Sequence, residues 1–293
     1  AQDARYRFEL ADSHADVADA WQGLCDLQKA NEHRLENVHL AARQFDVNPA
    51  SNRLKQDYAN ALSGLALVQQ QSGKLDEAIT TLEASLELQT DLVEEDPSNL
   101  RKRWNLIRKS AYQAKFLDMA GERARSQSLS EWIFTRMSEL TAQGQEIRID
   151  QSVAYGMFLR DWAHRAYHAG QAETASKRMK ETIEQLKNIA LEHPNNGMAL
   201  NELALSYFYF WDHNNHVLSD PDAAGWLSKA RKASSQKGCS ARDLAARQAV
   251  MQDKPDEARA YTSRLLERGY LENDFMQFCL DRGLCAAVGR SFQ

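Results

Sequence analysis

The chain has few of the residues that interrupt helices. Only 5 prolines and 13 glycines occur among its 293 residues. Because these two residue types mark turns, their scarcity predicts that long helices dominate. There is also no run of about 18 apolar residues, so the sequence predicts no membrane-spanning helix. The formal net charge of −5 argues against nucleic acid as a partner, since duplex binding usually needs a net basic face.

Cysteine is scarce as well. The four cysteines, Cys25, Cys239, Cys279 and Cys285, are too few to define a disulfide framework in a chain of this size. They lack CxxC spacing, which argues against a zinc site built on cysteine. Cys279 and Cys285 lie close enough in sequence to form a bridge across a helix end, and the alternative is that they are buried free thiols.

Sequence motifs of common enzymes are missing. The chain contains no GxGxxG, no P-loop and no GxSxG, and we found no pattern of nucleophile, base and orienting group. We therefore expect no catalytic activity and no cofactor. The chain begins with Ala1 and lacks a basic-then-apolar leader, so we expect a mature form or a piece of a longer protein.

The chain does contain a repeat of about 48 residues. Gly73, Gly121 and Gly170 follow one another at intervals of 48 and 49. A small residue stands five positions after each glycine: Ala78, Ser126 and Ala175. Prolines keep the same interval at Pro49, Pro97 and, two periods later, Pro194. Projected back by one period, Ala78 falls on Ala30, which predicts a diverged first copy.

Each period has the pattern of two helices. Apolar residues recur at spacings of three and four between Leu54 and Val68, and again between Leu75 and Leu92; this is the pattern of a helix with one buried face. Gly73 fits the left-handed residue that ends the first helix. Pro97 fits a helix start, with Asp96 as the predicted N-cap.

The stretch "ALSGLALVQQQSGKLDEAITTLEASLEL" resembles a tetratricopeptide repeat (TPR). The family's small residue in the first helix, its glycine before the second helix and its later alanine match Ala66, Gly73 and Ala78. The resemblance implies an all-α fold, a right-handed α-α superhelix of about six helix pairs and a cap. Family repeats have 34 residues, and the extra 14 would add about two turns to each helix.

The resemblance also implies how the chain is divided. We expect a single TPR-like solenoid over residues 1–293, with a diverged repeat at 1–49 and three long repeats at 50–193. Ala223 and Ala258 are 35 apart and each follows a "PD" pair, which predicts two shorter repeats at 194–268. Residues 269–293 are expected to form a C-terminal cap, because the apolar end of a solenoid needs one.

A finer resemblance concerns longer proteins. The stretches "EEDPSNLRKRWNL" and "LLERGYLENDF" are similar to the C-terminal repeat regions of bacterial membrane-anchored Ser/Thr kinases and winged-helix regulators. This implies an extracytoplasmic sensory or docking part of a signalling protein. The alternative is a free-standing, cytoplasmic repeat protein. Solenoids often pair through terminal helices, so residues 3–45 are the candidate for a homodimer contact.

The TPR resemblance predicts where a partner binds. In that family the first helix of each pair lines a concave groove, whose polar side chains bind an extended peptide. The matching positions are Asn60, Ser63, Gln70, Gln71, Arg108, Lys115, Arg160, His164, Tyr167 and His168. The alternative is that these are ordinary solvent-facing residues. We predict a non-catalytic scaffold for a protein or peptide partner.

Three other clusters carry polar or aromatic side chains. His164 and His168 share one helix face, but His213 and His216 would add metal ligands only if their loop folded back, so we predict no metal site.

The six basic residues between Arg101 and Lys115 form either a basic patch or a charge complement to nearby acidic residues. Five consecutive aromatic residues, 207–211, are expected to be buried; the alternative is a small-ligand pocket of a sensory domain, formed by Tyr207, Tyr209 and Trp211.

Overall fold

The described part of the chain is helical. The computed structural model describes residues 2–142, 148–214, 220, 222–233 and 239–285, and these contain thirteen α-helices and no strand. The all-α prediction, with six helix pairs and a final short helix, is confirmed. None of the helices in these ranges is both long and apolar enough to cross a membrane.

The helices form two compact units. Unit 1 comprises residues 1–143 and 268–274, and unit 2 comprises residues 144–267 and 275–293. The helices of unit 1 are α1 (Gln2–Gly23), α2 (Leu27–Val47), α3 (Asn52–Gln71), α4 (Leu75–Glu95), α5 (Leu100–Met119) and α6 (Arg123–Ala142). Unit 2 contains α7 (Ile149–His168), α8 (Ala172–Glu192), α9 (Gly197–His213), α10 (Ala223–Ala233), α11 (Cys239–Met251), α12 (Pro255–Glu267) and most of α13 (Asn273–Asp281).

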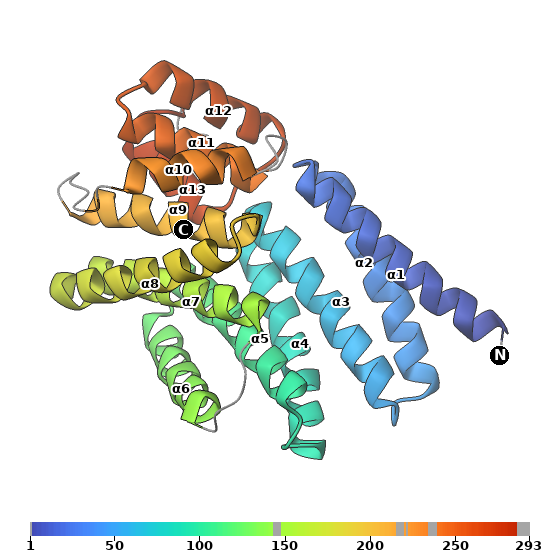
Figure 1. The fold of residues 1–293 in the computed structure, drawn as a ribbon. Coiled ribbons are helices and arrows are strands. Elements are labelled where there is room, and N and C mark those ends of the chain that lie inside the picture. The colour runs from blue at the N-terminus through green and yellow to red at the C-terminus, as the bar shows by residue number, and fades with distance from the viewer. Residues whose placement is uncertain (1, 143–147, 215–219, 221, 234–238, 286–293) are drawn as a thin grey trace. The chain divides into compact units, whose positions relative to one another are not determined.

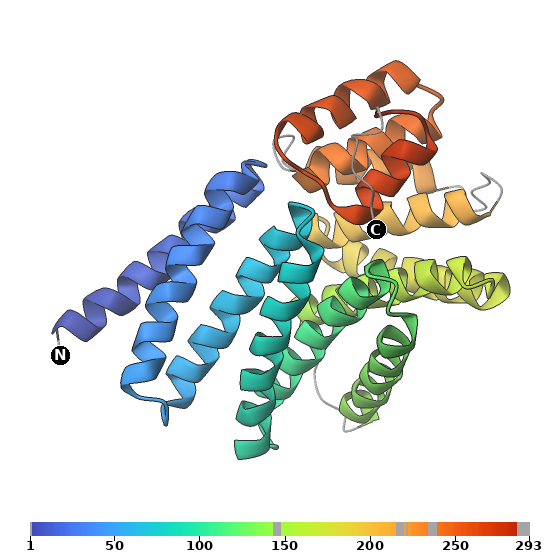
Figure 2. The same cartoon turned by 180° about the vertical axis from the view of Figure 1, so that it is seen from behind.

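Within each unit, helices that follow one another in sequence pack against one another. In unit 1 each helix from α1 to α5 contacts the next (Figures 1 and 2), and in unit 2 the same holds from α7 to α12. Helices α3 to α8 have 20 or 21 residues each, whereas α10 to α12 have 11 to 13. The longer repeat therefore comes from longer helices, as predicted.

A left-handed residue ends the first helix of most hairpins. Gly73, Gly121 and Gly170 have φ of 75°, 81° and 80°, which confirms the role predicted for Gly73. Cys25 (φ 64°) and Asp253 (φ 55°) take the same conformation in the α1–α2 and α11–α12 hairpins. At each turn the next N–H reaches back to a carbonyl five residues earlier, as from Lys74 N to Gln69 O at 2.9 Å.

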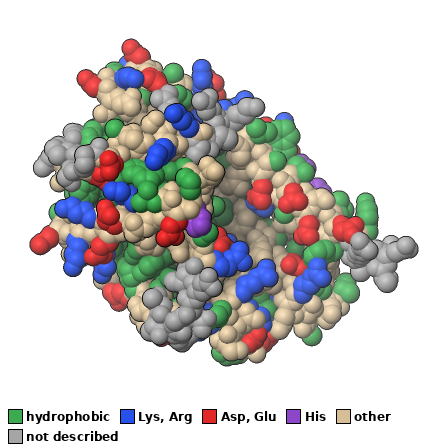
Figure 3. Space-filling model, viewed as in Figure 1, with side chains coloured by type: hydrophobic (Ala, Val, Ile, Leu, Met, Phe, Trp, Pro, Cys, Tyr) green, Lys and Arg blue, Asp and Glu red, His purple; other side chains and the backbone are tan. Residues whose placement is uncertain are grey.

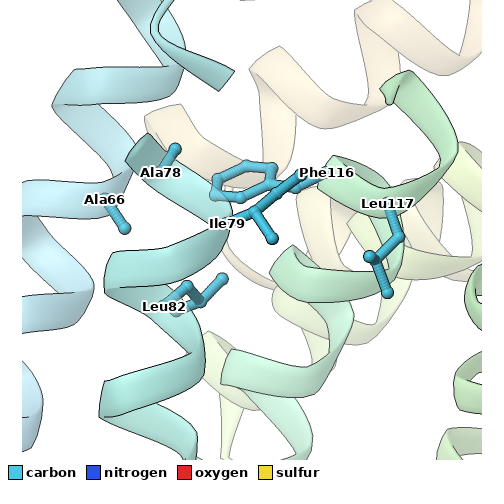
Figure 4. Close-up of a cluster of buried hydrophobic side chains, with 6 residues drawn as sticks. All are labelled: Ala66, Ala78, Ile79, Leu82, Phe116 and Leu117. Carbon is cyan, nitrogen blue, oxygen red and sulfur yellow. The ribbon is translucent and has the colours of Figure 1, made fainter. Parts of the chain in front are cut away.

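The next helix of each hairpin then approaches its partner at a small residue. The residue five positions after each of these five hairpin residues is at most 2% exposed. These residues are Ala30, Ala78, Ser126, Ala175 and Ala258. Figure 4 shows Ala66 on α3, Ala78, Ile79 and Leu82 on α4, and Phe116 and Leu117 on α5, and these six residues form one buried cluster. The small side chains permit the close helix contact on which this core depends.

The predicted start of α5 is wrong by three residues. Helix α5 begins at Leu100, and its N-cap is Asn99, whose side chain accepts a hydrogen bond from Lys102 N at 3.2 Å. Asp96 instead follows the end of α4 and accepts a hydrogen bond from Asn99 Nδ2 at 3.0 Å. Pro97 lies in the turn because the capping side chain comes two residues after it, as at Pro49/Ser51 and Pro194/Asn196.

The left-handed turn can be tested by adding one methyl group. At Gly121 no heavy atom lies within 4 Å of the position that a Cβ would take, so Gly121→Ala adds backbone strain without a clash. We expect a loss of about 1–2 kcal/mol in the free energy of unfolding. The matched control is Gly225→Ala in α10, where Cβ also has open space and φ is not positive; there we expect a gain of up to ~1 kcal/mol. Urea unfolding followed by circular dichroism measures both, and equal effects of the two substitutions would contradict the assignment.

Candidate functional site

A cavity of about 170 Å³ lies between α1, α2 and α3 in unit 1. Helix α2 contributes one stripe of its lining at spacings of three and four, and α1 and α3 contribute the facing walls. The polar lining residues are Asp12, Arg34, Asn37, Gln44, Asp57 and Asn60, and the apolar ones include Phe8, Ala11 and Leu54. Asn60, which the sequence placed in the peptide groove, thus lines a hollow of the surface.

Arg34 forms one wall of this cavity although it is only 8% exposed. Its guanidinium forms an ion pair with Asp19. A Cβ on Gly64 would lie 3.0 Å from Arg34 Cζ, so the missing side chain at Gly64 lets the guanidinium lie against α3. Arg34 Nε is buried and donates no hydrogen bond to any described residue.

Two carboxylates of the cavity carry raised pKa values. Burial raises the pKa of Asp12, and nearby Asp16 adds to the effect. Burial also raises the pKa of Asp57; Arg53 counteracts this and Asp12 reinforces it. Asp57 Oδ2 lies 3.9 Å from Arg53 Nε but accepts no hydrogen bond from the described residues. Both carboxylates would therefore be stabilised by an additional donor or cation.

Three other predicted groove positions bind a segment of the chain itself. Gln70 Nε2 donates to Glu272 Oε1 at 3.0 Å, and Lys115 Nζ lies 3.2 Å from the same oxygen. Gln71 takes part through its backbone, because its carbonyl accepts from Leu271 N at 2.8 Å. The segment 268–274 of unit 1, which is non-helical from 268 to 272, is thus held by residues that the sequence predicted to bind an extended peptide.

The remaining predicted positions of α3 and α5 differ in exposure. Ser63 is 9% exposed and therefore buried, whereas Asn60 and Arg108 are exposed. Next to Arg108, Lys109 is fully buried and its Nζ donates to Ala59 O at 2.8 Å, Ser85 Oγ at 3.0 Å and Asn60 Oδ1 at 3.3 Å. Burial, reinforced by Arg108, lowers the pKa of Lys109 to about 7.

Three of the six basic residues of the run on α5 are paired with acidic residues. Lys102 lies 3.6 Å from Asp96, and Arg103 lies 3.7 Å from Glu139. Lys115 pairs with Glu272, and Lys109 is buried. These contacts agree with the interpretation of the run as a charge complement to nearby acidic residues, and not as a basic patch. Figure 3 likewise shows basic and acidic side chains interspersed on the face in view.

On α7 in unit 2, Arg160 is 5% exposed and bonded to two carboxylates. Its Nε and Nη2 donate to Asp161 Oδ1 at 3.0 and 2.7 Å, and its Nη1 pairs with Glu202 of α9. Burial alone would lower the pKa of Arg160, but these carboxylates more than offset burial and raise it. Arg160 therefore joins α7 to α9.

The other predicted groove residues of α7 gather at the end of α9. His164 Nδ1 lies 3.1 Å from His213 Nε2. The ring of Tyr167 stacks on His213 with centroids 3.8 Å apart and an interplanar angle of 3°. His168 is exposed and its ring centroid lies 4.5 Å from that of His164. His216, which the sequence offered as a further ligand, lies outside the described residues.

The aromatic run on α9 is buried, as predicted, from Tyr207 to Phe210, at 1–6% exposure. Tyr207 donates a hydrogen bond to Asp220, and burial together with this bond raises the pKa of Tyr207. Trp211 is partly exposed and lies 6.0 Å from Phe208, centroid to centroid. A ligand pocket at Tyr207, Tyr209 and Trp211 stays a prediction.

Several site residues were not predicted from the sequence. Glu272 had no local signal, because its partner Gln70 is 202 positions away. Lys109 was interpreted only as part of the basic run, and Arg34 lies in a helix with many charged residues. Cys25 did have a signal: it precedes Ala30 by five residues, as Gly73 precedes Ala78.

The cysteine pair at the C-terminus is joined. Cys279 and Cys285 form a disulfide with Cα atoms 5.6 Å apart, a separation typical of such bridges. Of the two alternatives for this pair, the bridge across a helix end is therefore confirmed and the free thiols are not.

Comparison with known proteins identifies no family. No protein-family model matches the chain, and no curated protein matches it. Among solved structures it is similar to pilF of Pseudomonas aeruginosa (TM-score 0.41) and to a tetratricopeptide repeat protein from Parabacteroides merdae ATCC 43184 (TM-score 0.35). Each is 14% identical, and each match covers 94% of this chain and 99% of the other. Similarity at this level carries no argument about function.

The buried Lys109 predicts a pH dependence of stability. With a folded pKa of about 7 and an unfolded pKa near ~10.4, the unfolded chain binds more protons between these values. The free energy of unfolding should therefore rise from pH 7 to 10, by roughly 2–5 kcal/mol from this group. Lys109→Met should lack this rise, whereas the exposed Lys74→Met should keep it. Chemical denaturation at several pH values tests this, and parallel profiles for wild type and Lys109→Met would refute it.

Proposed function

We propose that the chain is a non-catalytic scaffold that binds a protein partner through an extended segment of that partner. The α1–α3 cavity receives one side chain of the segment. The observation that carries this proposal is that the cavity combines an exposed predicted groove residue, Asn60, with buried polar atoms of Arg34 and Asp57 that lack hydrogen bonds within the described residues.

The size of the cavity favours a peptide over a metabolite. Pockets for drug-sized ligands measure roughly 300–1,000 Å³, whereas this cavity measures about 170 Å³. Such a volume suits a single amino-acid side chain, with the rest of the partner lying across the neighbouring helices. A protein partner gains the remaining affinity from that wider contact.

The charges of the cavity indicate what this side chain carries. Arg34 is neutralised by Asp19, so the nearby positive charges are those of Arg53 and, for Asp57, also Arg101. Their raised pKa values mean that their charges are poorly compensated. A lysine, arginine or amide side chain of the partner would supply the missing donors.

Segment 268–274 supports extended-chain binding on the adjoining helices. Glu272 is 5% exposed and is bound by Gln70 and Lys115. The amide of Leu271 pairs with a carbonyl at the end of α3. Side chains of first helices in this chain thus hold a non-helical segment through one buried polar side chain and the backbone, which is the contact that we propose for a partner.

Other features stay predictions from the sequence. These are the attachment to a membrane-anchored signalling protein, the pairing of two chains through residues 3–45, and the small-ligand alternative on the aromatic run. The aromatic side chains that this alternative would use are largely buried.

Selection from a random peptide library, followed by affinity measurement, tests the proposal. Peptides selected on the full chain should be enriched in lysine, arginine or glutamine at one position. Fluorescence anisotropy should show that Asp57→Asn weakens the best peptide by about tenfold or more, because a charge-assisted hydrogen bond contributes ~1.5–3 kcal/mol. Asp57→Asn should remain folded, since neutralising a carboxylate with a raised pKa does not destabilise the chain at neutral pH.

The matched control is Glu87→Gln on α4, an exposed position in the second helix of its hairpin. It should change the affinity by less than about twofold. If no peptide is enriched, or if Asp57→Asn and Glu87→Gln have the same effect, the α1–α3 cavity is not the binding site.

A further inference from the structure

Three histidines of unit 2 converge at the C-terminal ends of α7 and α9. His164 and His168 are one helical turn apart on α7, and His213 is the last residue of α9. One ring nitrogen of each lies within 4.8 Å of the others. Since His213 belongs to the helix, no loop has to fold back to complete the group.

The spacing of the nitrogens suits a metal ion. For a tetrahedral ion with Zn–N bonds of about 2.0–2.1 Å, two ligand nitrogens lie about 3.3 Å apart. His164 Nδ1 and His213 Nε2 are 3.1 Å apart, so this pair is already at ligand spacing. The third ring, His168, is exposed, and exposed side chains change rotamer rapidly. It can therefore close on the ion without moving either helix.

Aromatic neighbours fix the planes of the two inner rings. Tyr167 stacks on His213 at 3.8 Å, and Tyr209 lies against His164 with centroids 4.4 Å apart. Such packing orients imidazole ligands before an ion arrives and lowers the entropy lost on binding. The two inner ligands are thus preorganised.

The charges beside the cluster do not oppose a cation. Arg160 lies one turn before His164 and is bonded to both Asp161 and Glu202. Arg247, whose guanidinium lies 5.5 Å from the Tyr209 ring, is paired with Asp243. Both arginines near the Tyr209 ring are thus paired with carboxylates, so neither places an uncompensated positive charge beside the cluster.

We propose that His164, His168 and His213 form a binding site for a divalent transition-metal ion of the zinc type, with a fourth coordination position open to water. Three imidazoles select zinc, copper or nickel over magnesium and calcium, which prefer oxygen ligands. The bound ion joins the end of α7 to the end of α9. This site is independent of the peptide-binding function proposed for unit 1.

The chain contains a matched control for this proposal. His14 and His33 of unit 1 place two Nδ1 atoms 3.0 Å apart, nearly the same separation as in the His164–His213 pair. They form a pair without a third histidine, aspartate, glutamate or cysteine within reach among the described residues. Three ligands should bind Zn²⁺ much more tightly than two.

The experiment uses the full chain without a polyhistidine tag, stripped of metal by a chelator and titrated with Zn²⁺ against a chromophoric chelator. Wild type and His33→Gln should bind one Zn²⁺ with a Kd below about 10 µM. His168→Gln and His213→Gln should each weaken binding by at least about tenfold. Circular dichroism confirms that the variants fold, which is expected because His168 is exposed and His213 ends its helix.

A visible spectrum of the Co²⁺-loaded chain adds an independent measurement, because ligand-field bands report the coordination geometry. The bands of a four-coordinate ion should be present in wild type and His33→Gln and lost in His168→Gln. The proposal is overturned if wild type binds no Zn²⁺ in this range, if only one of His168→Gln and His213→Gln weakens binding, or if His33→Gln weakens it as much as they do.

Discussion

The left-handed residue at the end of the first helix is the constraint on which five of the hairpins depend. It reverses the chain within a few residues and fixes where the second helix begins. A small residue then follows five positions later, at Ala78 after Gly73 and at Ala258 after Asp253, and both alanines are 0% exposed. Turn and close contact are thus coupled, because a change in turn length would rotate the alanine out of the contact between the helices.

The same regularity brings polar residues of successive first helices together at a separation of 49, one more than the interval of 48 from Gly73 to Gly121. Gln22 donates to Gln71, Gln70 to Met119 and Lys109 to Asn60, across α1–α3 and α3–α5. In unit 2 the corresponding contact across α7–α9 is that of His164 with His213, also 49 apart. These contacts lie at different positions along the first helices, and they use amides in unit 1 and imidazoles in unit 2, so one spacing between first helices supports different chemistry.

The long helices, their order and the glycine turns could be predicted from the sequence because each depends on local signals. Apolar spacing sets the buried face, and Gly73, Gly121 and Gly170 mark the turns. The first residue of α5 was misplaced because Pro97 was taken as the helix start, whereas Asn99 provides the cap.

The buried ion pairs could not be predicted in the same way. An apolar stripe shows which helix face is inside but not which charges lie at its edge. Arg160 was therefore assigned to a solvent-facing groove, although Glu202, 42 residues later, neutralises it in the interior. The partner of such a group comes from another hairpin, and no spacing within one helix reveals it.

These internal partners decide which first-helix positions remain available to other molecules. Gln70 and Lys115 are engaged by Glu272, and Arg160 by Asp161 and Glu202. A partner would have to displace those carboxylates, at the cost of leaving buried charges uncompensated. Asp57 differs from these residues, because its carboxylate is poorly compensated before any partner binds. The raised pKa of Asp57 reflects this. A donor bound there would relieve an existing electrostatic penalty, and for this reason the α1–α3 cavity is a better candidate for recognition than the predicted groove positions that contact the chain itself.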